Sequence, residues 1–476
     1  MDVNQENTRT PPRPSSPAPE AVASVPFWEA LRFWFKLGFI SFGGPAGQIA
    51  IMHRELVEEK RWISERRFLH ALNYCMLLPG PEAQQLATYI GWLMHRTWGG
   101  VVAGVLFVLP SFFILIALSW IYVVFGSVPW VAGLLYGIKP AVAAIVVQAV
   151  HRMGSKTLKK PATAPVLWAV ATLSFIAVAF LNIPFPWVVL GAALTGWLGQ
   201  RWVPAQFVAG GTHQGAKDVR ALKHAAALID DDTPTPRHAQ FRLSRLAKVL
   251  TVGALLWLLP MAALMAWQGP NPTLAQMGLF FSKAALLTFG GAYAVLPYVY
   301  QGAVEHYGWL TGPQMMDGLA LGETTPGPLI MVVAYVGFLG GWVKQVLGGD
   351  TLFLGAALAA WVVTWFTFLP SFVFILAGGP LVESTHGKLH FTAPLMAITA
   401  AVVGVMASLA LLFIVHIAGG TRASGLFGLS IDLAALALVA LVALAALALL
   451  RFKWGVIAVI AASALAGLGL RLLGWG

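Results

Sequence analysis

Two versions of one motif organise this sequence: Lys36-Leu37-Gly38-Phe39-Ile40-Ser41-Phe42-Gly43-Gly44 and Lys283-Ala284-Ala285-Leu286-Leu287-Thr288-Phe289-Gly290-Gly291. They begin at positions 36 and 283, an offset of 247 residues. The same offset relates Trp62 to Trp309, and the Pro-Gly-Pro motif of 79–81 to that of 326–328. Leu-Pro-Ser-Phe also occurs twice, at 109–112 and 369–372. Such an ordered series indicates an internal duplication.

The composition is that of a membrane protein. Of the 476 residues, 58% are hydrophobic and only 10% are charged, and the mean hydropathy is +0.76. Several apolar runs are long enough to cross about 30 Å of hydrocarbon; among them are Val101–Phe125, Thr163–Leu181, Leu352–Ala377 and Leu433–Leu450. We therefore predict an all-α polytopic membrane protein in the bacterial inner membrane.

The duplication and the composition together predict five segments. A polar, proline-rich tail (1–26), which we expect to be disordered, precedes a first repeat (27–203). A polar linker follows (204–248), then a connecting transmembrane helix (249–268) and a second repeat (273–476). We expect the tail and the linker to be cytoplasmic.

The charges of matched loops indicate that the repeats are inverted. The loop after the first Gly-Gly carries five basic residues, Arg54, Lys60, Arg61, Arg66 and Arg67, whereas 301–317 has no Lys or Arg. Likewise a predicted basic loop, 151–160, follows the fourth apolar unit and carries Arg152, Lys156, Lys159 and Lys160, while 417–430 offers only Arg422. Because basic loops favour the cytoplasm, the two halves should be inserted in opposite directions. Inverted repeats are typical of secondary transporters.

The repeated Gly-Gly and Pro-Gly-Pro motifs interrupt apolar segments. Proline lacks an amide donor and glycine tolerates unusual backbone angles, so a regular helix should stop at Pro79, Pro81, Pro326 and Pro328. The charges of the first half favour nine full crossings with four re-entrant hairpins, because the basic loops 53–67, 95–96 and 151–160 are then all cytoplasmic. Thirteen crossings are the alternative, which keeps the orientation of the later spans and differs in the side on which loop 53–67 lies. Broken helices expose backbone N–H groups and a positive dipole end, which suits an anion.

Four stretches carry a resemblance to a known family: Phe42-Gly43-Gly44-Pro45, Leu78-Pro79-Gly80-Pro81-Glu82-Ala83-Gln84-Gln85-Leu86-Ala87, Phe289-Gly290-Gly291-Ala292-Tyr293 and Thr325-Pro326-Gly327-Pro328. The chain resembles the chromate ion transporter family, in its long form with two homologous domains. The resemblance implies export of cytoplasmic chromate, with sulfate as a competitor, driven by the proton or charge gradient. The long tail and the charged linker depart from the family pattern.

Chromate is a tetrahedral dianion, so its site needs positive charge and hydrogen-bond donors. The leading cations are Lys36 and Lys283, at matched positions in apolar segments, where a charged lysine is expensive and is retained for a partner or a pathway. The alternative is that each snorkels to the interface. The other substrate-binding candidates flank the interruptions: Ser41, Gly43, Gly44, Gly80, Gln84, Gln85, Thr288, Gly290, Gly291, Thr324, Thr325 and Gly327. The hydroxyl groups could instead satisfy backbone carbonyls.

Glu82 and Glu323 flank the two Pro-Gly-Pro motifs and are candidates for proton coupling. Burial favours the neutral form of a carboxyl group, and a charged carboxylate would repel a dianion. We therefore expect chromate to bind when these groups are protonated. Each could instead pair with a lysine.

Other functions are less consistent with the sequence. The +11 net charge lies in short loops without interleaved aromatic residues, so we expect no nucleic-acid partner. The single cysteine, Cys75, excludes a multi-cysteine metal site, and His386 and His390 lack the glutamate of a helical zinc motif. No Gly-x-x-x-x-Gly-Lys motif is present, so we expect neither ATP nor another cofactor. Three alternatives stay open: sulfate as the cargo, a passive channel and an intramembrane enzyme. No motif encodes the oligomeric state, and a dimer is possible.

Overall fold

The computed structural model describes residues 25–158, 160–207, 227–231, 233, 236, 238–268, 272–385, 392–419 and 433–474. Within these ranges the chain is helical, and its one β-type contact is an isolated bridge between Ile63 and Ile229. The predicted all-α polytopic fold is confirmed.

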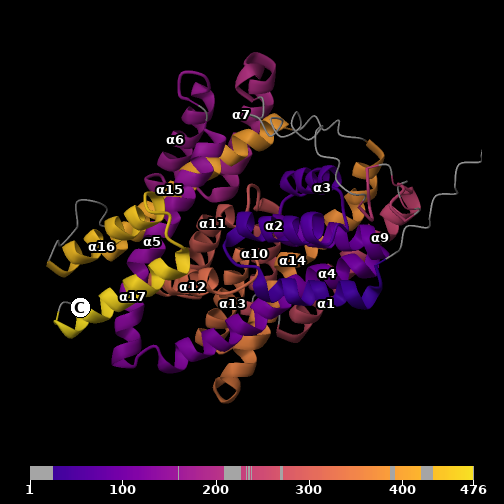
Figure 1. Ribbon diagram of the computed structural model, residues 1–476. Coiled ribbons are helices and arrows are strands. Elements are labelled where there is room, and N and C mark those ends of the chain that lie inside the picture. The colour runs from indigo at the N-terminus through magenta and orange to yellow at the C-terminus, as the bar shows by residue number, and fades with distance from the viewer. Residues whose placement is uncertain are drawn as a thin grey trace, which may run out of the picture.

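The helices of the two halves and of their connection follow one another along the chain (Figure 1). The first half holds α1 (Phe27–Ile40), α2 (Gly44–His53), η1 (Arg54–Glu59), α3 (Glu65–Leu77), α4 (Glu82–Phe125), α5 (Pro129–Thr157), α6 (Pro165–Ala179) and α7 (Phe185–Trp202). The connection holds η2 (Pro204–Phe207) and α9 (Leu243–Gln268). The second half holds α10 (Thr273–Leu287), η3 (Ala292–Val295), α11 (Leu296–Tyr300), η4 (Gln301–His306), α12 (Gly312–Thr324), η5 (Leu329–Met331), α13 (Val332–Val343), η6 (Gly349–Thr351), α14 (Leu352–Thr385), α15 (Thr392–Ile417), α16 (Leu433–Leu450) and α17 (Val456–Leu472).

Local structure repeats at the same 247-residue offset as the sequence. The π-helices η1 and η4 occupy matched positions, and α3 and α12 begin and end at matched residues. Both of these helices are capped in the same way: the side chains of Ser64 and Thr311 accept hydrogen bonds from the backbone N–H groups of Arg67 and Gln314. The two halves therefore share one local fold.

The helices stop at the four repeated motifs. α1 ends before Gly43-Gly44 and α10 before Gly290-Gly291, while each Pro-Gly-Pro separates a short helix from the next element. The glycines adopt left-handed backbone angles, with φ of 87° at Gly43, 126° at Gly80, 80° at Gly290 and 103° at Gly327. Only glycine enters this region without steric cost. The prediction that regular helix ends at these motifs is confirmed.

α4 is a helical hairpin rather than one long rod. His95 and Arg96 have non-helical backbone angles, and they separate a short limb (82–94) from a long one (97–125). The limbs pack closely, because a Cβ on Gly100 would lie 2.8 Å from the Cβ of Trp92. In the second half α13 packs on α14 in the same manner, with a Cβ on Gly341 only 2.6 Å from the Cβ of Ala359.

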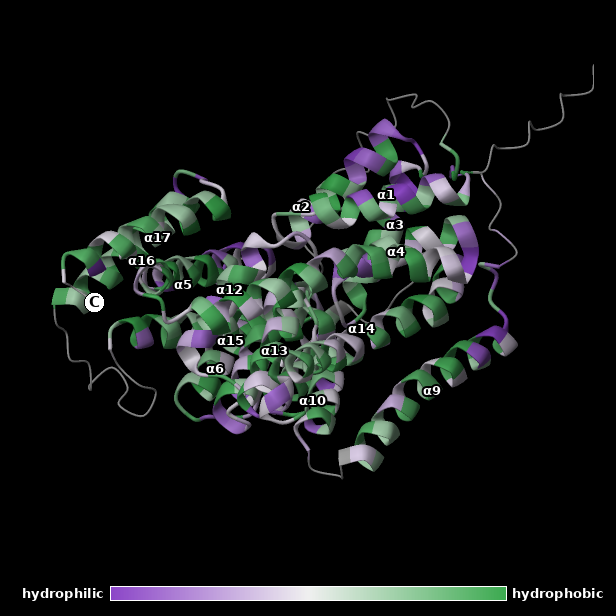
Figure 2. Cartoon of the chain, turned by 90° about the horizontal axis from the view of Figure 1, so that it is seen from below, coloured by the Kyte–Doolittle hydropathy of each residue, from purple (hydrophilic) through white to green (hydrophobic). Residues whose placement is uncertain are grey.

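Six helical segments of the described chain are long and apolar enough to cross a membrane. They are Glu82–Phe125, Pro129–Thr157, Leu243–Trp267, Gly349–Glu383, Ala393–Ile417 and Leu433–Leu450. Six of the nine predicted full crossings thus reach this length and hydropathy, and α6, α7 and α17 are not among them. Figure 2 shows apolar residues along the outer helices α9, α16 and α17.

The sequence interpretation of 151–160 as a basic loop is wrong for its first seven residues. α5 continues to Thr157, so Arg152 and Lys156 lie on its last turns at i,i+4 spacing, on one face. The helix continues because this end packs against α15, where a Cβ on Gly154 would lie 3.5 Å from Val403. Lys159 lies outside the described residues.

Part of the linker is docked on the first half. Its Ile229 is buried and pairs with Ile63, and Asp231 accepts a hydrogen bond of 2.6 Å from the Ser64 hydroxyl at the start of α3. Farther on, the ring of His238 lies 3.0 Å from the carbonyl oxygen of Trp92. Burial lowers the pKa of His238, which favours the neutral ring in this contact. The linker therefore braces α3 and the α4 hairpin.

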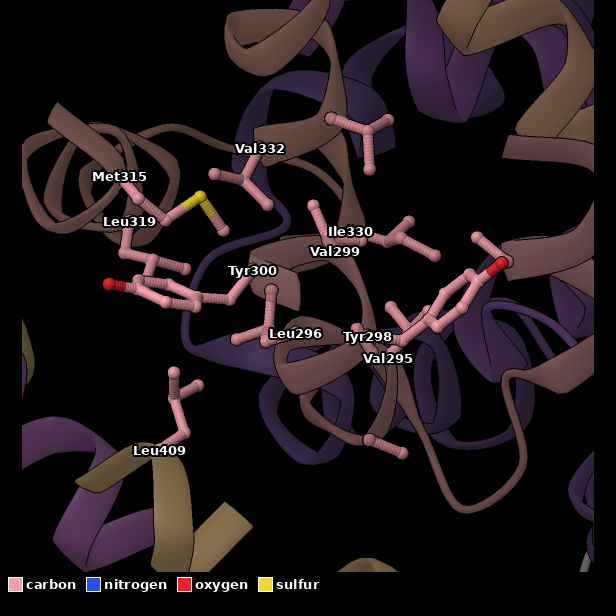
Figure 3. Packing of buried hydrophobic residues seen from close by; sticks show 14 of the residues in the cluster. Val295, Leu296, Tyr298, Val299, Tyr300, Met315, Leu319, Ile330, Val332 and Leu409 are labelled. Atoms are coloured by element: carbon pink, nitrogen blue, oxygen red, sulfur yellow. The ribbon is translucent and has the colours of Figure 1, made fainter. Parts of the chain in front are cut away.

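Apolar side chains surround the second-half interruption (Figure 3). Val295, Leu296 and Val299 from η3 and α11 are fully or almost fully buried, and they belong to one apolar cluster with Leu409 of α15 and Met315 of α12. This dense packing resists displacement of the backbone. The Gly290-Gly291 tip is therefore carried on a rigid base.

Candidate functional site

The interruptions of the two halves are joined by a reciprocal pair of backbone hydrogen bonds. The N–H of Gly80 donates to the carbonyl oxygen of Thr288 at 2.8 Å, and the N–H of Gly327 donates to that of Ser41 at 2.8 Å. Gly80 matches Gly327 and Ser41 matches Thr288 at the 247-residue offset. Each Pro-Gly-Pro thus closes on the Gly-Gly segment of the other half. Such an exchange is what two copies related by a local two-fold produce.

Each of the two Pro-Gly-Pro glycines also lies close to a serine of the other half. A Cβ on Gly327 would lie 2.8 Å from the Cβ of Ser111, and a Cβ on Gly80 would collide with the Oγ of Ser371. Ser111 and Ser371 are the serines of the repeated Leu-Pro-Ser-Phe motif. Glycine is therefore required at both positions by close approach and by backbone angle.

Three buried glutamines lie at the interruptions, and two of them donate to backbone carbonyls of the Pro-Gly-Pro motifs. Gln85 donates from Nε2 to the carbonyl oxygen of Pro79 at 2.8 Å, and Gln84 donates to Thr88 Oγ1 at 3.0 Å. Gln48, which the sequence interpretation missed, donates to the carbonyl oxygen of Gly327 at 2.5 Å. In all three the Oε1 atom is buried without a hydrogen-bond partner among the described residues. The unused hydrogen-bonding capacity of these side chains is therefore that of an acceptor. An acceptor suits a water molecule or a protonated group better than an anion that carries no proton.

The candidate hydroxyl groups are bound to their own helices. Ser41 donates to the Leu37 carbonyl at 2.7 Å, and Thr288 donates to the matched Ala284 carbonyl at 2.6 Å. Thr324 and Thr325 donate to carbonyls of the last turn of α12. These donors satisfy the free carbonyls of helix ends. These contacts are those of the alternative role that the sequence indicates for the hydroxyl groups, the satisfaction of backbone carbonyls, and contact with the substrate stays a prediction.

Lys36 and Lys283 are not brought to the interruptions. Both side chains are exposed, on α1 and α10. The ammonium of Lys36 forms a 3.0 Å ion pair with Glu55 of η1. Glycine 302 occupies the position matched to Glu55, so the pair has no counterpart in the second half. Their role as anion-binding cations stays a prediction.

Two other cations lie beside the second Gly-Gly tip. The guanidinium of Arg152 stands 5.5 Å from the ring centre of Tyr293 and acts electrostatically on Glu323. Tyr293 in turn donates its hydroxyl hydrogen bond to Glu323. Lys156, one turn farther along α5, acts electrostatically on Glu82. The last turns of α5 thus carry both cations of this region.

The tip itself lies close to these groups. A Cβ on Gly291 would lie 3.8 Å from Glu82 Oε1, and one on Gly290 would lie 2.8 Å from Met153 Cε, next to Arg152. The candidate site is therefore the Gly290-Gly291 tip with Glu82, Glu323, Arg152 and Lys156, which we call the tip site. A tip of free backbone N–H groups with flanking cations can hold an oxyanion.

Sequence reasoning found the two carboxyl groups but missed Arg152, Lys156, Tyr293 and Gln48. A signal for the two cations was present: they stand four residues apart directly after an apolar run, as on a continuing helix. A metal centre has no support in the part of the chain that the structure describes, which holds no group of three or more His, Cys, Asp or Glu suited to a metal. His386 and His390 lie outside the described residues.

Comparison with known proteins gives one consistent result. The family model described as Chromate transporter matches residues 28–197 and 275–468, once in each half. The chain is 31% identical over 473 residues to a chromate transport protein of Pseudomonas aeruginosa, covering 98% of both chains. It is 30% identical over 399 residues to one of Cupriavidus metallidurans, which covers 83% of this chain and 85% of the relative. A probable chromate transport protein of Synechococcus elongatus is 29% identical over 357 residues, which is 75% of this chain and 76% of the relative. No solved structure matches the chain.

Alanine at either Pro-Gly-Pro glycine should damage the joint between the halves. A left-handed backbone costs a residue with a Cβ about 1–2 kcal/mol, and the added Cβ also meets Ser111 in Gly327→Ala. We expect Gly80→Ala and Gly327→Ala to lower the thermal unfolding midpoint of the purified protein. Gly469→Ala is the matched control, because a Cβ there meets nothing within 4 Å. Equal midpoints for all three variants would contradict this description of the joint.

Proposed function

Because this chain belongs to the chromate transporter family, we propose that it exports chromate from the cytoplasm as a secondary active transporter coupled to the proton gradient. The family match and the multi-pass helical fold support transport of chromate across a bacterial membrane. The observation that carries the proposal is the tip site, where two cations and two carboxyl groups flank a backbone interruption.

The charges of the tip site link chromate binding to protonation. With Glu82 and Glu323 ionised, their two negative charges cancel those of Arg152 and Lys156. With both carboxyl groups protonated, two positive charges remain, which match a dianion. A carboxylate 4 Å from an oxyanion charge costs about 4 kcal/mol at an effective dielectric constant of 20. Proton binding and chromate binding therefore favour each other.

The cargo's charge also makes the membrane potential a driving force. Moving one elementary charge through 100 mV changes its free energy by about 2.3 kcal/mol, so a dianion leaving a negative interior gains about 4.6 kcal/mol. Each proton that leaves with chromate reduces this gain by about 2.3 kcal/mol. Export therefore requires that fewer than two protons accompany each chromate, or that the chromate gradient supplies the difference.

We propose that the two halves are inserted in opposite directions and exchange inward-open and outward-open arrangements. The reciprocal hydrogen bonds between Gly80, Thr288, Gly327 and Ser41 support this, because each half completes the interruption of the other. The excess of basic residues in the first-half loop supports the opposite insertion. Lys36 and Lys283, exposed on α1 and α10, are proposed to attract the anion on its way to the tip site.

Sulfate is the second candidate cargo, since it shares the charge and the tetrahedral shape of chromate. Competition by excess sulfate against chromate uptake into everted vesicles ranks the two anions. Chromate as the cargo predicts that inhibition requires sulfate in large excess, and strong inhibition by equimolar sulfate would favour sulfate. A passive channel predicts flux that ignores an imposed pH or voltage gradient.

Removing the two carboxyl groups should abolish the pH response of transport. In proteoliposomes, wild-type chromate flux should fall as pH rises, by at most about tenfold per pH unit for each coupled proton, because ionised Glu82 and Glu323 oppose the dianion. The variants Glu82→Gln and Glu323→Gln cannot lose this proton, and their combination should give a flat profile. The pH range is kept where chromate stays a dianion. A double variant with the full wild-type pH response would contradict the coupling.

Arg152 should contribute more to chromate affinity than either exposed lysine. Arg152 is half-buried beside Tyr293, and a hydrogen bond to a charged group contributes about 1.5–3 kcal/mol, so Arg152→Ala should weaken chromate binding by about tenfold or more. Arg201→Ala is the matched control, because that arginine also stands over an aromatic ring, 4.5 Å from Trp197, but is exposed. Affinities are measured with radiolabelled chromate on purified protein. A larger loss in Lys36→Ala or Lys283→Ala would place the anion elsewhere.

A further inference from the structure

A second buried ionisable group lies on α12, away from the tip site. Asp317 is only 3% exposed, in the middle of the helix. Its Oδ2 atom accepts a 2.9 Å hydrogen bond from the hydroxyl of Tyr122, while Oδ1 has no hydrogen-bond partner among the described residues. Six residues at 1.5 Å per residue separate it from Glu323 by about 9 Å along the helix axis. One helix thus carries two carboxyl groups, of which that of Asp317 is buried and that of Glu323 half-buried.

Titratable groups come from four helices that pack on α12, namely α4, α5, α13 and α15. Tyr122 comes from α4, and Tyr335 of α13 packs against it with ring centres 5.6 Å apart. Lys139 of α5 acts electrostatically both on Asp317 and on His416 of α15. α17 also packs on α12, and its charged residue Arg471 lies beside Gly133 of α5. The short helix η5 contacts α12 as well, but it contains only apolar residues.

The histidine of this cluster is also incompletely bonded. His416 Nδ1 is buried without a partner within the described ranges, and its ring touches the first turn of α12, where a Cβ on Gly312 would lie 3.2 Å from Nε2. Leaving a buried polar atom unsatisfied costs about 1–3 kcal/mol, and more for a charged group. Asp317 Oδ1 and His416 Nδ1 are two such unsatisfied atoms, and Lys139 acts electrostatically on both groups. This combination indicates groups that exchange a proton rather than groups that form a fixed structural contact.

A purely structural role fits Asp317 poorly. The residue matched to it in the first half is His70, although α3 and α12 have the same bounds and the same cap. The repeated frame therefore folds without a carboxyl group at this position. A purely structural hydrogen bond to the Tyr122 hydroxyl would need only one acceptor oxygen. In a structural role, the second carboxyl oxygen would also have a hydrogen-bond partner, because buried polar atoms in proteins usually do.

We propose that Asp317, with Tyr122, Lys139 and His416 around it, is a proton-binding site that loads Glu323 along α12. The inference rests on the proposed proton-coupled function and names the route by which the proton reaches the tip site. The proton adds to the Asp317 carboxylate to give the acid, and passes on to Glu323 through hydrogen-bonded water, with no other bond changed. Asp317 does not touch the oxyanion; it is a relay residue.

The test separates proton movement from chromate movement in the full-length protein. Chromate-for-chromate exchange in proteoliposomes requires no net proton transfer, whereas net flux under a chromate gradient does. We expect Asp317→Asn to keep exchange within about twofold of wild type and to lower the proton flux per chromate, read from an internal pH dye, at least tenfold. Tyr122→Phe should lower the same ratio less. Glu383→Gln is the matched control, because that carboxyl accepts a hydrogen bond from Tyr89 in the same way and should leave both readouts unchanged.

Two results would overturn the inference while leaving proton coupling intact: an unchanged proton-to-chromate ratio in Asp317→Asn, or a parallel loss of exchange and net flux together with a lowered unfolding midpoint. Wild-type protein that moves chromate with no proton movement would instead overturn the coupling itself, and with it any relay. Dependence of wild-type flux on sodium at constant pH would assign the cluster to a metal cation and also contradict the proposal.

Discussion

Everything in this structure depends on how the backbone groups released by four helix breaks are satisfied. Far from water, an unpaired amide or carbonyl costs several kcal/mol, so irregular backbone survives at membrane depth only with partners. Here the partners are exchanged: the N–H of Gly80 binds the carbonyl of Thr288, and the N–H of Gly327 binds that of Ser41. Neither half can complete its own interruption. The site exists only when both halves are folded together.

This constraint distinguishes two groups of residues: those that satisfy the backbone at the helix breaks, which we call the frame, and those that form the tip site. The hydroxyls of Ser41 and Thr288 and the amide nitrogens of Gln48 and Gln85 donate to backbone carbonyls, so they stabilise the breaks, and their contact with the cargo stays a prediction. In the proposed site, positive charge for the anion comes from α5, which presents Arg152 beside the second Gly-Gly tip. The duplicated motifs thus build a symmetric frame, and residues without a counterpart, such as Glu323 and Asp317, give the second half its ionisable groups.

The sequence predicted the frame better than the site. Gly-Gly and Pro-Gly-Pro have local backbone preferences strong enough to predict where helices end, and their repetition predicted which segments correspond. The contacts across the halves are set by tertiary packing, which no local pattern encodes. For that reason the matched position of Lys36 predicts a binding role, whereas its side chain is exposed and paired with Glu55, and the charge pattern predicts a loop at Arg152, which lies on α5. The docking of the linker could not be predicted from a local pattern either. Its residues Ile229 and Asp231 bind Ile63 and Ser64, which are far away in the sequence.

The central claim is that two copies of one fold enter the membrane in opposite directions, so that their interruptions face each other. Glu58 and Glu305 test it, since they are matched at the 247-residue offset and both are exposed. With buried Cys75 replaced by serine, Glu58→Cys and Glu305→Cys are labelled in intact cells and in everted vesicles with a membrane-impermeant thiol reagent. The proposed arrangement predicts labelling of position 58 from the cytoplasmic side and of position 305 from the opposite side. Labelling of both positions from the same side would contradict it.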